Sequence, residues 1–257
     1  MSENFEGANL GEAFVGAVET HDVEGLRRLL ESGLDPTVEI RGRSTIEWMI
    51  EMYTRSSRFS SCLELVLDAG AELDDAGLRA VLLDDAAGVA RVIDADPSQL
   101  DRKLSLVTTF ALLNQASLLH VAAEFGNTNA VAALIAAGAD IEAQAAIDEF
   151  GVGGQTPLFQ TVNTAFNHCA PAMELLLDAG ARVDVRLAGL RWGKDFPWET
   201  TLYDVTPLSY AQAGLLPQFH RAPVDIQDNV ERLLAAAGRP VPPRVNIPNA
   251  YVMGKTT

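Results

Sequence analysis

Pairs of aliphatic residues followed by a small turn and an acidic residue recur along the chain. The motif reads LLESGLD at 29–35, VLDAGAE at 66–72 and LIAAGAD at 134–140, and LLDAGAR at 176–182 is a variant without the acid. A weaker copy ends at Gly238. A glycine after an aliphatic run supplies the left-handed cap that ends many helices. Each copy therefore predicts the C-terminal end of a helix.

A second pattern upstream of these motifs predicts where a partner helix begins. It reads STIEWM at 44–49, SLLHVA at 117–122, TPL at 156–158 and TPLSYA at 206–211. Ser and Thr cap helix N-termini, and Pro is well tolerated at the first helical position. The interval from Gly70 to Gly138 is about twice that from Gly33 to Gly70, and apolar spacing at 78–97 predicts a degenerate copy between them.

These motifs resemble the T-P-L-H-x-A signature and the period of about 33 residues of the ankyrin-repeat family. The resemblance implies an all-α solenoid of about six helix-pair repeats over residues 1–239, near 8–41, 42–75, 76–115, 116–151, 152–203 and 204–239. Residues 240–257 would form an extended, Pro-containing C-terminal tail. The resemblance also implies that His120 is a structural histidine that hydrogen-bonds between repeats.

A long loop insertion after the fifth repeat, 186–203, departs from the pattern. It is rich in aromatic residues and slightly basic, and such residues often anchor interfaces. We therefore predict partner contacts at Arg186, Arg191, Trp192, Lys194, Phe196, Trp198 and Tyr203. The alternative is that its aromatic side chains fold back and cover a helix pair.

The variable position of the signature lies on the inner helix, which lines the concave groove of ankyrin-repeat proteins. Here it is occupied by Trp48, Val121, Gln160 and Tyr210. We predict partner contacts at Trp48, Gln160 and Tyr210, or packing of the large aromatic side chains against the long loops.

Composition narrows the class of partner. The formal net charge is -16, and 48% of the residues are hydrophobic, which excludes a disordered acidic tail. A nucleic-acid or anionic-membrane surface needs dense Lys and Arg, so we expect neither partner. The charge favours either a basic partner or solubility alone. With no secretory signal, no membrane-length apolar run and two widely spaced cysteines, we expect a soluble, cytoplasmic, monomeric protein.

We find no catalytic motif in the sequence. We find no paired metal-ligand spacing and no phosphate-binding loop, so we expect no cofactor and no metal, and we interpret 151–154 as a flexible linker. The sequence favours a non-catalytic protein–protein interaction module that uses the inner helices and projecting loops. The alternatives are an acidic inhibitor or immunity-type protein that masks a basic enzyme, or an enzyme with a pocket under 186–203. Glu47, Asp204, Tyr210 and His220 would then supply acid and base.

Overall fold

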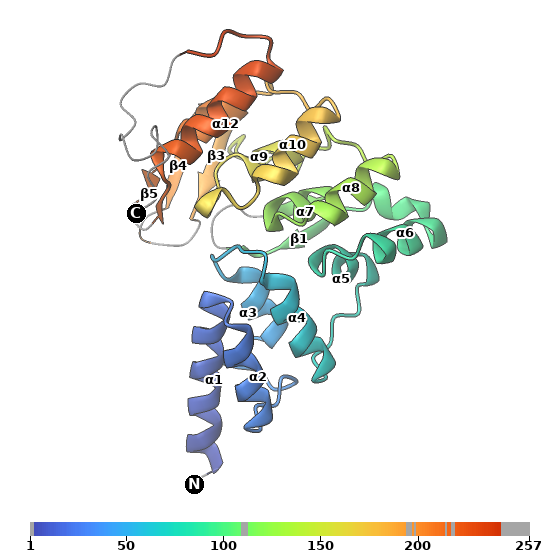
Figure 1. Cartoon of the computed structure of the whole chain (residues 1–257), viewed down its shortest axis with the longest axis vertical. Helices are drawn as coiled ribbons and strands as arrows, with labels where there is room; N and C mark the ends of the chain where they lie inside the picture. Colours follow the sequence, from blue (N-terminus) through green and yellow to red (C-terminus); the bar gives the residue numbers. More distant parts are fainter. Residues whose placement is uncertain are drawn as a thin grey trace.

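The computed structural model describes residues 3–108, 113–193, 197, 199–213, 215–216 and 219–242. Side chains are described from residue 10, except at 215–216 and 219–220. Figure 1 shows helices packed in successive pairs, with short strands between later pairs. The helices are α1 (Glu3–Thr20), α2 (Val23–Glu31), α3 (Thr45–Glu51), α4 (Phe59–Asp68), α5 (Ala76–Leu82), α6 (Ala86–Ala95), α7 (Leu118–Phe125), α8 (Thr128–Ala136), α9 (Pro157–Thr161), α10 (Ala170–Asp178), α11 (Pro207–Gln212) and α12 (Pro223–Ala236), with 3-10 helices η1 (Pro97–Leu100) and η2 (Ala165–Asn167).

Local sequence explains where the helices begin and end. Asp22 and Asp85 cap α2 and α6, and their carboxylates accept hydrogen bonds from the N–H groups of Gly25 at 2.9 Å and Gly88 at 2.8 Å. A side-chain oxygen near the first turn satisfies an N–H group that has no partner within the helix. Gly126, with a φ of 67°, ends α7 in the left-handed region. The predicted helix boundaries are thus produced by the capping chemistry of these residues.

The prediction of an all-α fold is wrong. The described residues also contain three two-stranded antiparallel sheets. They are formed by β1 (Leu104–Leu106) with β2 (Leu113–Ala116), β3 (Leu187–Trp192) with β4 (Thr200–Val205), and β5 (Leu215–Leu216) with β6 (Phe219–His220). The expected long loop insertion is therefore mostly a β-hairpin. Alternation is partial in β3, where Ala188 and Arg191 are the more exposed positions among buried ones, and it is absent from β4, so burial periodicity gives only a weak strand signal here.

Regular stacking of the helix pairs is also interrupted. α5 packs on α7, α6 on α8, α7 on α9 and α8 on α10, but α3 and α4 have at most slight contact with α5 and α6. The turn between α3 and α4 instead reaches the C-terminal end of α7, where Arg55 meets Glu124. An even six-repeat solenoid requires each pair to pack on the next, so this part of the prediction is also wrong.

A buried ion pair joins the two sides of this interruption. An Arg55 nitrogen lies 3.2 Å from a Glu124 carboxylate oxygen, and only 4% and 9% of the two side chains are exposed. The guanidinium also lies 4.2 Å from the centre of the Phe125 ring. It donates hydrogen bonds to the carbonyl oxygens of Met52 and, at 3.0 Å, Thr54. Burial raises the pKa of Glu124 by more than the positive charge of Arg55 lowers it.

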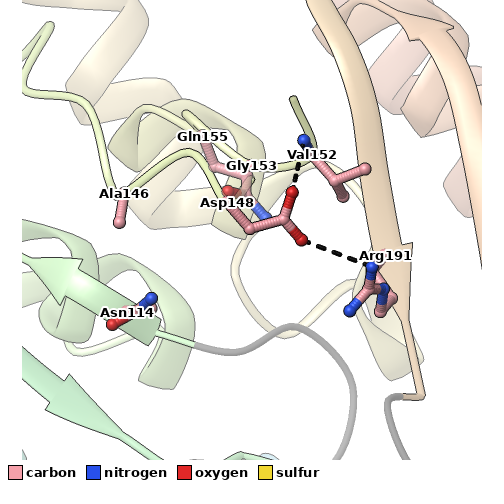
Figure 2. Close-up of a pocket in the computed structure, with 7 residues that line it drawn as sticks. All are labelled: Asn114, Ala146, Asp148, Val152, Gly153, Gln155 and Arg191. Carbon is pink, nitrogen blue, oxygen red and sulfur yellow. Dashed lines mark hydrogen bonds and ion pairs between the residues drawn. The ribbon is translucent and has the colours of Figure 1, made fainter. Parts of the chain in front are cut away.

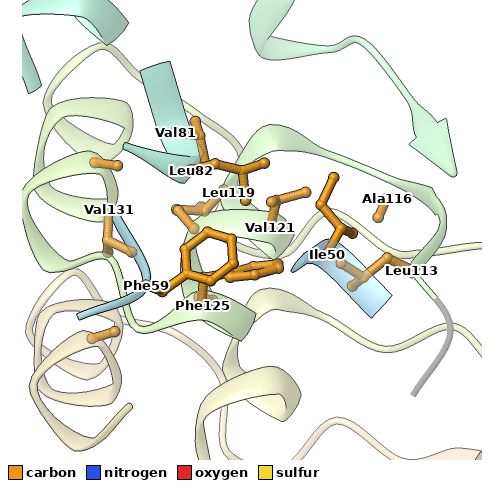
Figure 3. Close-up of a cluster of buried hydrophobic side chains, with 14 of the residues drawn as sticks. Ile50, Phe59, Val81, Leu82, Leu113, Ala116, Leu119, Val121, Phe125 and Val131 are labelled. Atoms are coloured by element: carbon orange, nitrogen blue, oxygen red, sulfur yellow. The ribbon is translucent and has the colours of Figure 1, made fainter. Parts of the chain in front are cut away.

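Apolar side chains surround this pair. The ring centres of Phe59 and Phe125 are 4.7 Å apart. Figure 3 shows these rings beside Leu82, Leu119 and Val131. The hydrophobic core is therefore continuous across the interruption, and the ion pair sits in a medium of low dielectric constant, where an unpaired charge is costly.

Elsewhere, His120 and Arg221 form hydrogen bonds to neighbouring segments of the chain. His120 Nε2 donates to the Gln155 carbonyl oxygen at 2.9 Å, and its Nδ1 accepts from the Ser117 hydroxyl at 2.8 Å, so the predicted hydrogen bond between successive pairs is confirmed. Near the other end of the chain, the buried Arg221 donates to the carbonyl oxygens of Ala211 at 2.7 Å and Val162 at 3.2 Å. These bonds fix the connections on either side of α9.

The described structure also bears on disulfide bonds, metal ligands and membrane-spanning helices. Cys62 and Cys169 are free and buried, and burial raises the thiol pKa to about 11 and about 12 respectively. Within the described part of the chain, no three His, Cys, Asp or Glu side chains group as metal ligands would. Of the helices described, none is long and apolar enough to cross a bilayer.

We expect Arg55→Leu to lower the free energy of unfolding by about 3–5 kcal/mol, because it leaves the buried Glu124 without its cation. Urea denaturation measures this change. The double variant Arg55→Leu/Glu124→Leu should recover much of the loss. Arg232→Leu is the matched control, since it breaks an ion pair with Glu174 that is open to solvent, and it should cost less than about 1 kcal/mol. Equal losses for both single variants would contradict the role of burial.

The buried His21 predicts a pH dependence of stability. Its Nδ1 lies 2.7 Å from the Ser56 hydroxyl, and burial, with the charges of Arg55 and Arg58, lowers its pKa from 6.5 to about 4. Between these pH values the unfolded chain binds the extra proton, so stability falls as pH falls, by up to about 1.4 kcal/mol per unit for this group. Urea titrations at several pH values should give a smaller slope for His21→Gln than for the wild type. The two slopes should converge above pH 7, and identical slopes below pH 6.5 would refute the assignment.

Candidate functional site

Three connections between helix pairs lie side by side and are joined through their backbones. They are residues 104–116, 140–156 and 186–206, which we call the finger platform. The N–H of Ala146 donates to the Asn114 carbonyl oxygen at 2.8 Å, and the N–H of Gly153 donates to the Gly189 carbonyl oxygen at 2.9 Å. Val152 and Gly189 form a parallel bridge. The three fingers therefore form one hydrogen-bonded surface.

The middle finger is tightly folded. Gly153 has a φ of 121°, and a Cβ at this position would lie 2.2 Å from the Ala146 carbonyl oxygen. Asp148 closes the turn, because its carboxylate accepts hydrogen bonds from the N–H groups of Phe150 and Val152, each at 2.9 Å. The interpretation of 151–154 as a flexible linker is wrong, because the glycines permit a close backbone approach instead of supplying freedom.

The β3–β4 hairpin presents a buried face and an open face. Leu190 and Trp192 point into the core, and Gly189 and Arg191 alternate with them on the other face. Tyr203 pairs directly with Gly189, so it lies on this second face, where 76% of it is exposed. The hairpin is thus anchored by Trp192 and displays Tyr203.

A small cleft is lined by residues of all three fingers (Figure 2). Its volume is about 120 Å³, and Asn114, Ala146, Asp148, Val152, Gly153, Gln155 and Arg191 line it. Arg191 reaches Asp148 at 3.3 Å and Glu199 at 3.6 Å, so carboxylates already neutralise the cation. Pockets for small-molecule ligands usually enclose about 300–1,000 Å³. This cleft is smaller than that range.

Exposed apolar side chains gather on the connections between helix pairs. The described chain exposes eight large hydrophobic residues, and five of them lie in such connections: Val38, Val107, Ile147, Phe150 and Tyr203. Phe150, at the tip of the middle finger, is 74% exposed. Phe166 is 89% exposed but lies in η2, within a helix pair. Most of the exposed large apolar side chains among the described residues therefore lie on the connections between helix pairs.

The predicted contact residues fall into distinct environments. Gln160, Trp192 and Tyr210 are buried, which makes them part of the scaffold in this structure. Burial also raises the pKa of the Tyr210 hydroxyl. Trp48 is half-buried, with its indole N–H donating to the Ile40 carbonyl oxygen at 2.8 Å and its ring 5.2 Å from the Arg43 guanidinium carbon. It braces the first inter-pair connection.

The other predicted contacts belong to the hairpin. Arg186 is exposed and forms an ion pair with Asp204. Arg191 and Tyr203 lie on the same face of the hairpin, and Arg191 lines the cleft. Lys194, Phe196 and Trp198 lie outside the described residues.

Of the acid–base candidates whose side chains are described, none lines the cleft. Glu47 bonds to the N–H of Ser44 at 2.7 Å in a capping box, and this hydrogen bond, with the one from the Ser44 hydroxyl, lowers its carboxyl pKa. Asp204 pairs with Arg186, and Tyr210 is buried in the core. His220 lies on β6, and its side chain is outside the described part of the chain.

Sequence reasoning missed the middle finger. Ile147, Asp148 and Phe150 were not singled out, although an aliphatic and an aromatic residue beside a glycine-rich turn are unusual in a solvated linker. An exposed apolar residue in a turn was the available signal.

The comparisons with known proteins identify one segment. Residues 114–146 match the family model for the ankyrin repeat, and this segment comprises β2, α7, α8 and the start of the middle finger. No curated protein matches the chain. The match covers a single repeat, so it does not support an array of six. Ankyrin repeats generally mediate protein–protein binding. The family resemblance drawn from the sequence is confirmed over this segment, and the chain contains an ankyrin repeat at residues 114–146.

Proposed function

We propose that this chain is a non-catalytic protein-binding module and that the finger platform contacts the partner. The observation that carries the proposal is the concentration of exposed apolar side chains on the connections between helix pairs, with Phe150 and Tyr203 the most exposed. Exposed apolar groups rimmed by polar residues mark interaction surfaces. The ankyrin repeat at 114–146 includes parts of the first and middle fingers and supports the same assignment.

The platform has the composition of an interface. Ile147, Phe150 and Tyr203 supply apolar contact area. Arg186 and Arg191, each already in an ion pair with a carboxylate, supply polar groups on the third finger. Aromatic residues and Arg are enriched in interface hot spots. Of the residues predicted from sequence, the proposal retains Arg186, Arg191 and Tyr203 as direct contacts, with Trp48 as a support for the first connection.

Backbone hydrogen bonds make the platform suitable for binding. Residues 146, 153 and 154 donate to carbonyl oxygens of the neighbouring finger or of the same turn at 2.8–3.0 Å. A surface that is already ordered loses less conformational entropy when a partner binds. The apolar tips are therefore held in place before the encounter.

We expect Ile147→Ser/Phe150→Ser to weaken partner binding by about 30-fold or more, which is the effect of removing a hot spot worth about 2 kcal/mol. Affinity capture from an extract of the source cells, followed by mass spectrometry and titration of the captured partner, measures the loss. Because both side chains are mostly exposed, the fold should be unaffected.

Phe166→Ser is the matched control for this experiment. It removes an even more exposed aromatic side chain from a turn inside a helix pair. Its captured partners and affinity should equal those of the wild type. An unchanged partner list for the Ile147/Phe150 variant, or equal losses for both variants, would reject the finger platform as the binding surface.

A further inference from the structure

We infer that the outer edge of β4 binds an extended segment of the partner as an additional β-strand. This inference deepens the proposed function and rests on it, because it states how the finger platform recognises its partner. Among the described residues, β4 pairs with β3 on one side only, and alternate backbone groups of β4 face away from β3. Main-chain pairing with such an edge is a recognised mode of peptide binding.

The orientation of the backbone follows from one hydrogen bond. The Gly189 carbonyl oxygen accepts from the N–H of Gly153, so the polar backbone groups of Gly189 face the middle finger and not β4. Gly189 and Tyr203 are directly opposite each other in the antiparallel register. They therefore form a non-hydrogen-bonded pair, in which both residues turn their N–H and C=O groups outward.

Backbone groups that lie two residues apart in a strand point in the same direction, so the same reasoning applies to Thr201. Thr201 is opposite Arg191 in the same register, so its N–H and C=O groups also point away from β3. Among the described residues, the backbone groups of Thr201 and Tyr203 form no hydrogen bond with a backbone segment outside the hairpin. Two residues in alternation thus offer the donors and acceptors that an added strand requires.

Natural sheets usually protect such an edge with Lys, Pro or a bulge. Thr201, Leu202 and Tyr203 carry no such device. The edge is interrupted only at Asp204, whose φ of 57° departs from an extended strand. The accessible part of the edge is therefore the segment from Thr201 to Tyr203, which suits a short extended peptide.

Side chains define the chemistry of the occupant. Tyr203 is 76% exposed on the open face, and its partner across the hairpin is Gly189, which covers none of its ring. An added strand would place a side chain directly beside this ring, and aromatic rings pair favourably with β-branched or aromatic neighbours. We expect an extended segment with such a residue opposite Tyr203.

A second copy of this chain is the less suitable occupant. Each copy carries a formal net charge of -16, so two copies repel each other when they approach closely. The segment that pairs with β4 should therefore belong to a different protein.

A phage-displayed library of short random peptides, selected on the full-length protein, tests the inference. Selected peptides should be extended and share a β-branched or aromatic position. Their binding is measured by fluorescence polarisation on Thr201→Pro and Thr201→Val. Proline removes the outward N–H without removing a bond to β3, so we expect about tenfold weaker binding, whereas valine keeps the N–H and should change the affinity less than about twofold.

Hydrogen exchange provides a measurement that does not depend on the proline variant folding normally. Bound peptide should slow exchange at the amides of Thr201 and Tyr203 in the wild-type protein. The inference is overturned if selection yields no binding peptide, if these amides are not protected, or if the wild type forms dimers through this edge.

The same variants separate this inference from the broader proposal. Cellular partner capture that is lost in Ile147→Ser/Phe150→Ser but fully retained in Thr201→Pro would leave the finger platform as the binding surface and reject strand addition. Loss of capture in Thr201→Pro but not in Thr201→Val agrees with strand addition.

Discussion

The buried ion pair between Arg55 and Glu124 is the constraint around which the rest of the structure is arranged. A carboxylate at the end of α7 cannot remain charged in an apolar core without a cation nearby. Arg55 meets this requirement only if the α3–α4 turn lies against α7. The second helix pair is thereby drawn toward the fourth, and the contact with α5 and α6 that a regular stack would have is reduced.

The charge of Glu124 also acts beyond this contact. It contributes, after burial, to the raised pKa values of the Cys169 thiol and the Tyr210 hydroxyl. The Cys169 Sγ lies 3.5 Å from the Glu124 carbonyl oxygen, and the neighbouring His168 ring lies 3.0 Å from that of Phe125. One helix end therefore joins segments from the first half of the chain to α10 and α11.

The helix pairs could be predicted because they depend on local chemistry. Ser44, Gly126 and Thr206 cap helices through groups within a few residues, and the sequence contains all of that information. The site depends on pairing between distant segments, such as Ala146 with Asn114 and Gly153 with Gly189. Burial is non-local too: Tyr210 and Trp192 are chemically suited to an interface, yet packing from several elements places them in the core. Arg55 likewise gave no sign in the sequence of its distant partner.

The turn at the tip of the middle finger stabilises itself. Asp148 supplies both acceptors that hold the turn, and the glycines at 151 and 153 supply its backbone conformation. The side chains of Glu149 and Phe150 take no part in the two hydrogen bonds that hold this turn. The side chains that we propose for recognition and the residues that hold the turn are therefore different residues of the same loop. Under the proposed function, the tip side chains can be exchanged without altering the hydrogen bonds that fix the turn.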